Sequence, residues 1–434
     1  MKVRGRLKRP IGRNCVLVLT AAGVCFAAAD SAPAGAREAV DCGRADTLCV
    51  DVIDGSRREF STIQAAVKRA RAGDTVVVFP GDYAGFRATR SGTANRRIVV
   101  SGKPGARITS SERRSDDGVY LRRVSFVTIR GFEIVANKMR YGIGAHDARA
   151  TRPMRGLEIL DNVVTDASSS GIYMSQVADS LIAGNTSTGA REEHGIYLAN
   201  AGSDDTVLRA NTCSGNAING IHFNGDARLG GDGVHTGLVV DGNLLYGNEA
   251  NGFDADGVRS SSFVNNVVYA NGRHALRVFA IDAAAGPADL VIANNTFVDN
   301  DGWAIKLTQD DGGHTIFNNI MLSKAGSLAV DSDLVADYNV GTTYSLDGEA
   351  TVIGLAGWRA AGHGANSLEA SRNKLFAKPN KADLTLKADS PAVDAGVAKL
   401  AGKGAPRRDI DGERRPRGAA VDLGAYEHDA VSEP

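Results

Sequence analysis

Apolar and polar residues alternate with a period of two in short segments that recur through residues 117–320. Apolar residues on either side of one variable residue are typical of a β-strand that buries a single face. The segments recur every two to three dozen residues: DGVYL, YGIGA, SGIYM, HGIYL, NGIHF, NGFDA, HALRV and WAIKL. Recurrence of one unit at this interval predicts a stack of β coils.

A second short apolar strand in each unit ends at an asparagine. These asparagines are separated by 23 to 32 residues: Asn162, Asn185, Asn211, Asn243, Asn266, Asn295 and Asn319. A constant structural position with variable spacing indicates coils of fixed form that carry loops of different length. One buried asparagine per coil can hydrogen-bond to those above and below, which satisfies each buried amide. We therefore predict an all-β solenoid over residues 61–340.

The ends of an open stack need covers, because they expose apolar surface and unpaired strand edges. At the N-terminal end, Ser61-Thr-Ile-Gln64 has the form of a helix capping box. One apolar stripe follows and predicts a helix over the first coil: Ile63, Ala66, Val67 and Ala70. The asparagine series stops after Asn319. We predict that residues 341–434, with a short helix near Trp358, form a cap that returns over the last coils.

Composition and charge narrow the range of partners. The chain has 51 glycines and 43% apolar residues, which suits many short strands and tight turns. Its formal net charge is zero. Because a phosphate backbone binds to a basic surface, we do not expect a nucleic acid partner. We expect a monomer.

Residues 1–36 have the features of a Sec-type signal peptide. A basic segment without acids precedes the apolar stretch CVLVLTAAGVCFAAA, and small residues follow near Ala29 and Ala36, where a peptidase could cut. The apolar stretch is short for a membrane span, and no later segment is long and apolar enough. We expect a secreted or periplasmic protein without a membrane span after cleavage. An uncleaved N-terminal anchor is the alternative.

Three cysteines remain after cleavage. Cys42 and Cys49 lie in a lead-in over residues 37–60 and could form a disulfide in an oxidising compartment. Cys213 follows Asn211 at an inward position, which predicts a small buried thiol.

Three parts of the chain resemble a known family. The GIYL/NxxxxN coils look like the right-handed parallel β-helix repeats of the pectate-lyase-like superfamily. The opening FSTIQAAVKRARAGDTVVVFPGDY is similar to the start of many such proteins, and SPAVDAG, DIDGERRP and VDLGAYE are similar to a C-terminal module often joined to them. The resemblance covers residues 55–427. It implies a right-handed parallel β-helix, a fold that hosts many functions.

Function must then be read from outward-facing side chains, which stacking aligns into columns about 4.8 Å apart per coil. One predicted column is Tyr120, Gly144, Tyr173, Tyr197, His222, Asp254, Arg277 and Lys306. Its neighbour is Arg122, His146, Ser175, Ala199, Asn224, Asp256, Phe279 and Thr308. Three insertions follow the same strand: HDARATRPMRG, GDARLGGDGVHTG and AIDAAAGPAD. They are expected to wall one side of a groove that suits an extended polymer.

The residue types in this groove suit an acidic polysaccharide. Tyr173 and Tyr197 can stack on sugar rings, and the cations attract a polyanion. For abstraction of the C5 proton of a uronic acid, Arg277 would neutralise the carboxylate, His222 or Lys306 would act as base, and Tyr197 as acid or second base. Elimination makes the enzyme a polysaccharide lyase, which we prefer, and reprotonation makes it a C5-epimerase. The predicted substrate-binding residues are Arg122, His146, Tyr173, His194, Asn224, Asp254, Asp256 and His274.

The resemblance adds two expectations. Some lyases of this fold require calcium, and Asp254 and Asp256, with Asp226 or Asp232, could supply hard oxygen ligands; no other cofactor is expected. YGIGAHD and the two following coils look like mannuronan C5-epimerases, whose catalytic Asp and His carry over onto Gly144 and His146. The histidine matches and the aspartate does not. His194 and His274 match family positions at the turn before the strand, where a structural role is equally expected.

Two other classes stay open. Asp254 and Asp256 form an i,i+2 carboxylate pair on one face, a spacing compatible with glycoside hydrolysis. A non-catalytic carbohydrate-binding or cell-envelope protein would present the same groove without turnover.

Overall fold

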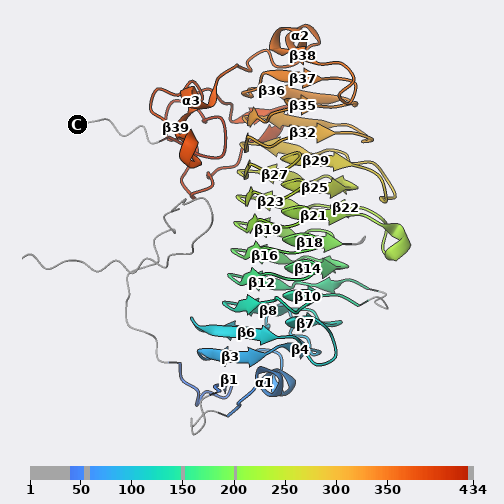
Figure 1. Cartoon of the computed structure of the whole chain (residues 1–434), viewed down its shortest axis with the longest axis vertical. Helices are drawn as coiled ribbons and strands as arrows, with labels where there is room; N and C mark the ends of the chain where they lie inside the picture. The colour runs from blue at the N-terminus through green and yellow to red at the C-terminus, as the bar shows by residue number, and fades with distance from the viewer. Residues whose placement is uncertain (1–39, 53–58, 148–151, 200–202, 429–434) are drawn as a thin grey trace, which may run out of the picture.

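The computed structural model describes residues 40–52, 59–147, 152–199 and 203–428. Parallel strands stack along one long axis into a solenoid (Figure 1). The coils between the two ends each add one strand to each of three sheets, so strands that are neighbours in a sheet come from successive coils. The protein is a right-handed parallel β-helix, as the repeats predict.

Sheet 1 contains twelve strands: β1 (Thr47–Val50), β2 (Thr75–Val78), β5 (Ile98–Gly102), β8 (Val127–Arg130), β12 (Glu158–Leu160), β16 (Leu181–Ala183), β19 (Val207–Arg209), β23 (Val239–Asp241), β27 (Ser262–Val264), β30 (Val291–Ala293), β33 (His314–Phe317) and β36 (Leu334–Asp337). Sheet 2 contains ten: β3 (Gly81–Ala84), β6 (Ala106–Ser110), β9 (Glu133–Val135), β13 (Val163–Thr165), β17 (Thr186–Thr188), β20 (Thr212–Ser214), β24 (Leu244–Tyr246), β28 (Val267–Tyr269), β31 (Thr296–Val298) and β34 (Ile320–Leu322).

Sheet 3 also contains twelve strands: β4 (Phe86–Ala88), β7 (Val119–Leu121), β10 (Ile143–Ala145), β14 (Ile172–Ser175), β18 (Ile196–Ala199), β21 (Ile221–Asn224), β25 (Phe253–Asp256), β29 (Leu276–Phe279), β32 (Trp303–Leu307), β35 (Gly326–Ala329), β37 (Thr343–Ser345) and β38 (Ile353–Gly354). Two-stranded ladders add β11 (Met154–Arg155) with β15 (Val177–Ala178), β22 (His235–Thr236) with β26 (Val258–Arg259), β39 (Phe376–Lys378) with β40 (Asp383–Leu386), and β41 (Lys399–Leu400) with β42 (Lys403–Gly404).

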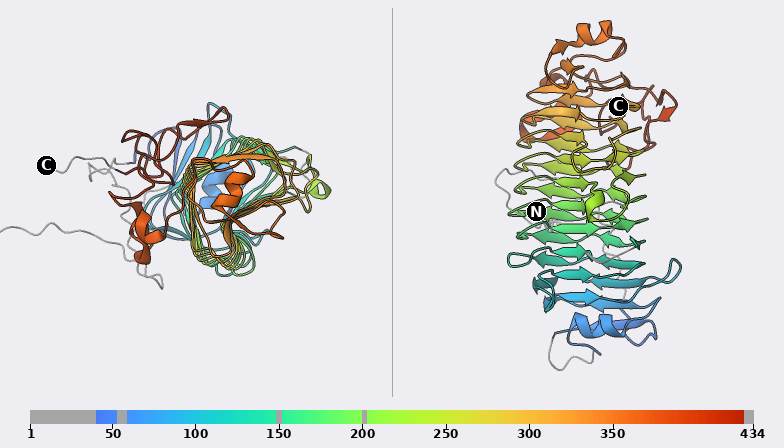
Figure 2. Two further views of the ribbon diagram at one scale, coloured as in Figure 1. Left: turned by 90° about the horizontal axis from the view of Figure 1, so that it is seen from above. Right: turned by 90° about the vertical axis from the view of Figure 1, so that its right-hand side faces the viewer.

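The stack is longer than the predicted 61–340 at both ends. β1 lies in the expected lead-in but pairs in parallel with β2, so it belongs to sheet 1. At the other end, β37 still pairs in parallel with β35. Helix α1 (Ile63–Arg69) lies at the N-terminal end and α2 (Leu355–Ala360) at the C-terminal end, and both overlie the coils when seen along the axis (Figure 2).

The predicted helix α1 forms, but its capping box does not. Thr62 is the N-cap, and its side chain accepts a hydrogen bond from the Ala65 N–H. The Gln64 amide instead bonds both backbone groups of Arg87 in β4, which ties the helix to sheet 3. The predicted apolar stripe is buried against the first coils.

Buried asparagines connect the coils as predicted. In each step an Asn side-chain oxygen accepts from the backbone N–H and the side-chain NH₂ of the Asn one coil below, as for Asn162 and Asn185 at 3.1 and 3.0 Å. The series runs beyond its predicted end, because Asn319 bonds Asn339 in the same way. A second, unpredicted ladder runs through the next turn: Asn216, Asn248, Asn271 and Asn300.

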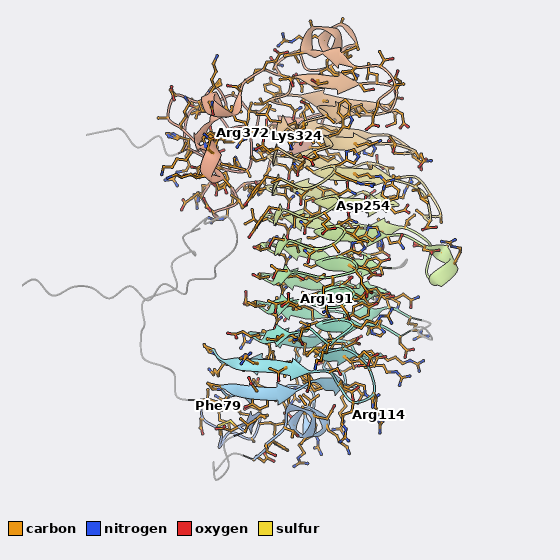
Figure 3. All side chains as sticks on the ribbon, in the orientation of Figure 1. Phe79, Arg114, Arg191, Asp254, Lys324 and Arg372 are labelled. Carbon is orange, nitrogen blue, oxygen red and sulfur yellow. A yellow bond between two sulfur atoms is a disulfide. The ribbon has the colours of Figure 1, made fainter. Side chains whose placement is uncertain are left out.

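The C-terminal cap returns along the outside of the last coils, as predicted (Figures 1 and 2). It contains α3 (Arg372–Leu375), the 3-10 turn η2 (Pro379–Lys381) and β39–β42. Its apolar side chains pack on the outer face of sheet 2, against Val267, Val298 and Ile320. Asn294 and Asn318 donate side-chain hydrogen bonds to cap carbonyls, and Arg372, labelled in Figure 3, pairs with Asp299.

The cysteines behave as predicted. Cys42 and Cys49 form a disulfide. Cys213 is fully buried, and burial raises the pKa of its thiol. The predicted signal peptide, residues 1–36, lies outside the described residues. Among the described helices, none has the length and apolar character of a membrane span.

Candidate functional site

The predicted outward column exists with the predicted register. In sheet 3, each residue of the column pairs with the next: Tyr120, Gly144, Tyr173, Tyr197, His222, Asp254, Arg277 and Lys306. We call this column, with the side chains that contact it, the outer stripe. Asp254, on β25, lies about midway along the solenoid (Figure 3). With a spacing of about 4.8 Å per strand, the seven steps span roughly 34 Å.

The neighbouring column is in register too, from Ser175 through Ala199, Asn224 and Asp256 to Phe279. Ala199 and Phe279 are buried, so this column is more enclosed than the first. Arg122 lies at its N-terminal end and pairs with Asp147 at 3.1 Å.

The N-terminal half of the outer stripe is a run of aromatic rings. Tyr141 stacks on Tyr173, with ring centroids 4.4 Å apart and planes at 7°. The His146 ring lies 4.8 Å from Tyr120 and 5.6 Å from both Tyr141 and Tyr173. Tyr197 then meets Tyr173 edge-on at 5.3 Å. Tyr141 is buried, so the rings on which sugars can pack are those of the partly exposed Tyr120, Tyr173 and Tyr197.

The C-terminal half of the stripe is built around the carboxylate of Asp254. Arg277 Nη1 lies 3.4 Å from Asp254 Oδ1, and His222 Nδ1 lies 3.4 Å from Asp254 Oδ2. Asn251 donates a further hydrogen bond to Oδ1 at 2.9 Å. Burial raises the pKa of Asp254, while His222 and Arg277 oppose that rise. The Asp254 side chain is 10% exposed and lies between His222 and Arg277.

This arrangement orients His222 and Arg277. His222 Nδ1 is 3.0 Å from the backbone carbonyl oxygen of Asp254, which can only accept, so Nδ1 carries a proton and Nε2 is the basic atom of the neutral ring. The Arg277 guanidinium lies 3.8 Å over the Phe279 ring, which fixes the plane of its fork.

Tyr197 is held next to His222. Their ring centroids are 4.9 Å apart, and the Tyr197 hydroxyl accepts a hydrogen bond from the Asn224 side chain at 3.2 Å. Burial raises the pKa of Tyr197, so the phenol keeps its proton. This favours the predicted role of acid over that of second base.

Lys306 has a partner that the sequence did not indicate. Its ammonium lies 2.9 Å from Glu349 Oε2, which comes from the turn after β37. Because its ammonium is held in an ion pair, Lys306 is better suited to contact a substrate carboxylate than to act as the base, the alternative role that the sequence predicts.

The structure corrects the predicted roles of Asp256 and Asp254. Asp256 is 1% exposed, and its oxygens accept from the backbone N–H groups of Ile281, Asp282 and Ala283. It therefore anchors the loop after β29 and does not face a substrate or a calcium ion. Asp254 is covered by its own neighbours, so it positions other side chains. The pair is likewise unsuited to glycoside hydrolysis, because neither carboxylate is accessible.

His194 and His274 serve the turns between coils. The His194 Nδ1 accepts from the Asn219 N–H at 3.3 Å, and the His274 Nδ1 accepts from the Trp303 N–H at 2.9 Å. Burial lowers the pKa of His194 well below its usual value and that of His274 to about 4. Both rings stay neutral in these structural roles, which corrects their placement among the substrate-binding residues.

Two of the predicted insertions form one wall. The loops after β21 and β29 project at the same edge of the solenoid (Figure 1). The Ala284 N–H donates a hydrogen bond to the Gly233 carbonyl at 3.0 Å. Arg228 forms ion pairs with Asp226 of its own loop and with Asp282 of the other loop. The third insertion includes residues 148–151, which lie outside the described residues.

We predict that Asp256→Ala loosens this wall. The three N–H groups of residues 281–283 lose their acceptor, so their hydrogen exchange should accelerate by at least about tenfold, the equivalent of one lost hydrogen bond. Hydrogen–deuterium exchange with peptide resolution measures this. Asp301→Ala, which removes an exposed ion pair on another turn, is the control. Unchanged exchange at 281–283 would show that Asp256 is not the anchor.

Three side chains of the stripe were not predicted. Asp117, from the turn before β7, bonds His146. Asp117 and Tyr141 are the first residues of the DGVYL and YGIGA segments, whereas Glu349 comes from a region without repeats. The shared place of the first two in the repeat was the sequence signal that could have assigned both to the same face.

The comparisons with known proteins support the fold. A family model of the periplasmic copper-binding protein NosD matches residues 72–230. No curated protein matches the sequence significantly. Among solved structures, pectate lyase Pel9A aligns with 14% identity over 88% of this chain and 97% of its own, with a TM-score of 0.58. XylC in complex with xylose aligns with 11% identity over 88% and 99%, with a TM-score of 0.51.

An epimerase is also among the similar structures. The A-module of mannuronan C-5 epimerase AlgE6 from Azotobacter vinelandii aligns with 17% identity over 71% of this chain and 93% of its own, with a TM-score of 0.43. The fold, its three sheets and the outer stripe define a solenoid that presents polar and aromatic columns. The protein has the parallel β-helix fold that pectate lyase Pel9A also has.

The described residues do not fit a copper site. They contain no group of three or more His, Cys, Asp or Glu side chains that could hold a metal ion. Soft thiolate ligands are missing among them too, because Cys42 and Cys49 are bonded to each other and Cys213 points into the core.

Proposed function

We propose that this protein is an exported enzyme that abstracts the C5 proton of uronic acid residues in an acidic polysaccharide, and that it is a lyase. One observation carries the proposal. A buried carboxylate, Asp254, holds Arg277 on one side and His222 on the other, with Tyr197 on the next strand. Four consecutive strands therefore carry the acid Tyr197, the base His222, the carboxylate of Asp254 and the carboxylate-binding fork of Arg277.

Each group has one role. Arg277 binds the substrate carboxylate and stabilises the negative charge that develops when C5 loses its proton. His222 Nε2 takes that proton. The electron pair of the C5–H bond forms the C4–C5 double bond, the C4–O bond breaks, and Tyr197 gives its proton to the leaving oxygen. Lys306 binds a second carboxylate of the polymer.

The test is an activity screen. The mature protein is incubated with polymannuronate, polyguluronate, polygalacturonate and hyaluronan, and with xylan as a neutral control, because one structural neighbour holds xylose. We expect products with the ultraviolet absorbance of an unsaturated uronate from one acidic polymer and none from xylan. Absence of such products from every polymer would overturn the lyase proposal.

A C5-epimerase is the second candidate, and the position of His146 favours it. This histidine lies beside Tyr141 and Tyr173, three strands from His222, so a second proton donor and acceptor face the groove. Deuterium incorporation at C5 without chain cleavage would identify this activity. Binding to the same polymers without products or exchange would indicate a carbohydrate-binding protein instead.

The proposed location is the periplasm or the outside of the cell. The disulfide between Cys42 and Cys49 suits an oxidising compartment, and the matching family is described as periplasmic. The N-terminal segment has the composition of a signal peptide.

A further inference from the structure

A second histidine of the outer stripe has its own buried carboxylate. His146 Nε2 lies 2.9 Å from Asp117 Oδ2. The Asp117 side chain is 2% exposed, whereas the His146 side chain is 24% exposed and borders the groove. Asp117 comes from the turn before β7, one coil below the strand that carries His146.

The carboxylate occupies space that a glycine leaves open. Gly144 stands in the outward column between Tyr120 and Tyr173, two residues before His146. A Cβ at Gly144 would lie 2.7 Å from Asp117 Oδ2, closer than atoms can pack, and 3.0 Å from the His146 ring, a tight contact. The missing side chain therefore creates the slot in which the two groups meet.

The contact determines the state of the imidazole. An ionised carboxylate accepts hydrogen bonds only, so Nε2 carries the proton and Nδ1 keeps the lone pair. Tyr120, Tyr141 and Tyr173 surround the ring and restrict its rotation. Charged groups on the neighbouring elements include Arg122 and Arg123, which both pair with Asp147, and Arg140, which lies 4.8 Å over the Tyr141 ring.

We propose that Asp117 is the positioning residue of His146 and that it makes Nδ1 of His146 a proton acceptor in the aromatic half of the groove. A negative charge in hydrogen-bond contact stabilises the imidazolium that forms on proton transfer, as a second carboxylate does for His222 in the other half. The substrate class, a uronic acid polymer, rests on the proposed function. The orientation of His146 by Asp117 is independent of the proposed function.

The first experiment needs no substrate. In protein labelled with ¹⁵N-histidine, NMR titration follows the His146 ring nitrogens in the wild type, Asp117→Asn and Asp116→Asn. Asp116 is the exposed neighbour of Asp117 in the chain, so its variant is the matched control. We expect Asp117→Asn to move the His146 ring-nitrogen resonances away from the pattern of the Nε2–H tautomer, because the carboxylate that accepts from Nε2 is gone. Asp116→Asn should leave this pattern unchanged. An unchanged tautomer in Asp117→Asn would overturn the proposal.

A second variant moves the carboxylate within the slot. Asp117→Ala removes it, and Asp117→Ala with Gly144→Asp returns one to the same space from β10. We expect the double variant to regain at least half of the lost Nε2–H tautomer of His146, which a general loss of packing at residue 117 would not permit. A double variant that behaves like Asp117→Ala, although it folds with the wild-type circular dichroism spectrum, would argue against a specific carboxylate at this place.

The activity arm separates this proposal from the proposed function. With an active polymer in hand, Asp117→Asn should lower kcat and leave KM nearly unchanged, whereas Asp116→Asn should change neither constant. A changed tautomer without turnover on any uronate leaves the positioning role intact and removes the proposed function. Turnover of Asp117→Asn at the wild-type kcat removes the positioning role from the reaction.

Discussion

Arg277→Ala is expected to lower kcat/KM on the active polyuronate by about 10³-fold, mostly through kcat. Loss of the C5 proton places a second negative charge next to the substrate carboxylate, and Arg277 is the fork that meets it. Its guanidinium is held between Asp254 and the Phe279 ring, so no reorganisation is needed as the charge develops. Initial rates of unsaturated product formation, measured over a range of substrate concentrations, give both constants.

Two further variants give this result its meaning. Arg277→Lys keeps the charge but loses the planar fork, so its rate should fall between the wild type and Arg277→Ala. Arg209→Ala removes an arginine of sheet 1, which pairs with Asp241 away from the stripe, and should leave the rate unchanged. If Arg277→Ala raises KM several-fold and leaves kcat untouched, Arg277 contributes only uniform binding and the proposed chemistry lies elsewhere.

The outer stripe was predictable because a β-helix is a periodic object. The alternation in each GIYL-like segment determines which residue points outward, and the parallel stacking then aligns Tyr173, Tyr197 and His222 without any further information. The asparagines fix the phase of each coil, so insertions of different length do not disturb the register. This is why eight positions of the column could be named from the sequence.

What surrounds the column could not be predicted in this way. Asp117 reaches His146 from a turn on the neighbouring coil, and Glu349 reaches Lys306 from beyond the repeats. Asp117 stands first in the DGVYL segment, but strand alternation does not indicate where the side chain of a turn residue points, and Glu349 lies outside the repeats. In the epimerases that the sequence resembles, the position that corresponds to Gly144 carries an aspartate. This protein has a glycine there, and the carboxylate of Asp117, from another coil, fills the space.

Asp256 illustrates the opposite error. Its place in the second column was correct, but an outward position need not be an exposed one. The loop after β29 folds back over the strand and brings three N–H groups to the carboxylate. Loop conformation, which has no periodic signal, therefore decides whether an outward acid faces solvent, substrate or backbone.

The largest effect on stability is expected from the asparagine ladder. Asn243→Ala removes one amide from the middle of the stack. The Asn243 side chain accepts from the backbone and side chain of Asn211 and donates to Leu208 and Asn266. All of these partners are buried, so the substitution leaves several polar groups without hydrogen bonds. We expect a loss of about 3 kcal/mol or more in the free energy of unfolding.

Urea unfolding followed by far-ultraviolet circular dichroism measures this loss as a lower midpoint. The matched control is Asn137→Ala, an exposed asparagine of an early turn, which should change the free energy by less than about 0.5 kcal/mol. Because each coil contacts only its neighbours, the loss at Asn243 should also appear locally, as faster hydrogen exchange in the adjoining coils before the ends of the stack respond. If Asn243→Ala and Asn137→Ala unfold at the same urea concentration, the strand hydrogen bonds and the apolar core alone hold the coils in register, and the ladder is a consequence of the fold and not one of its causes.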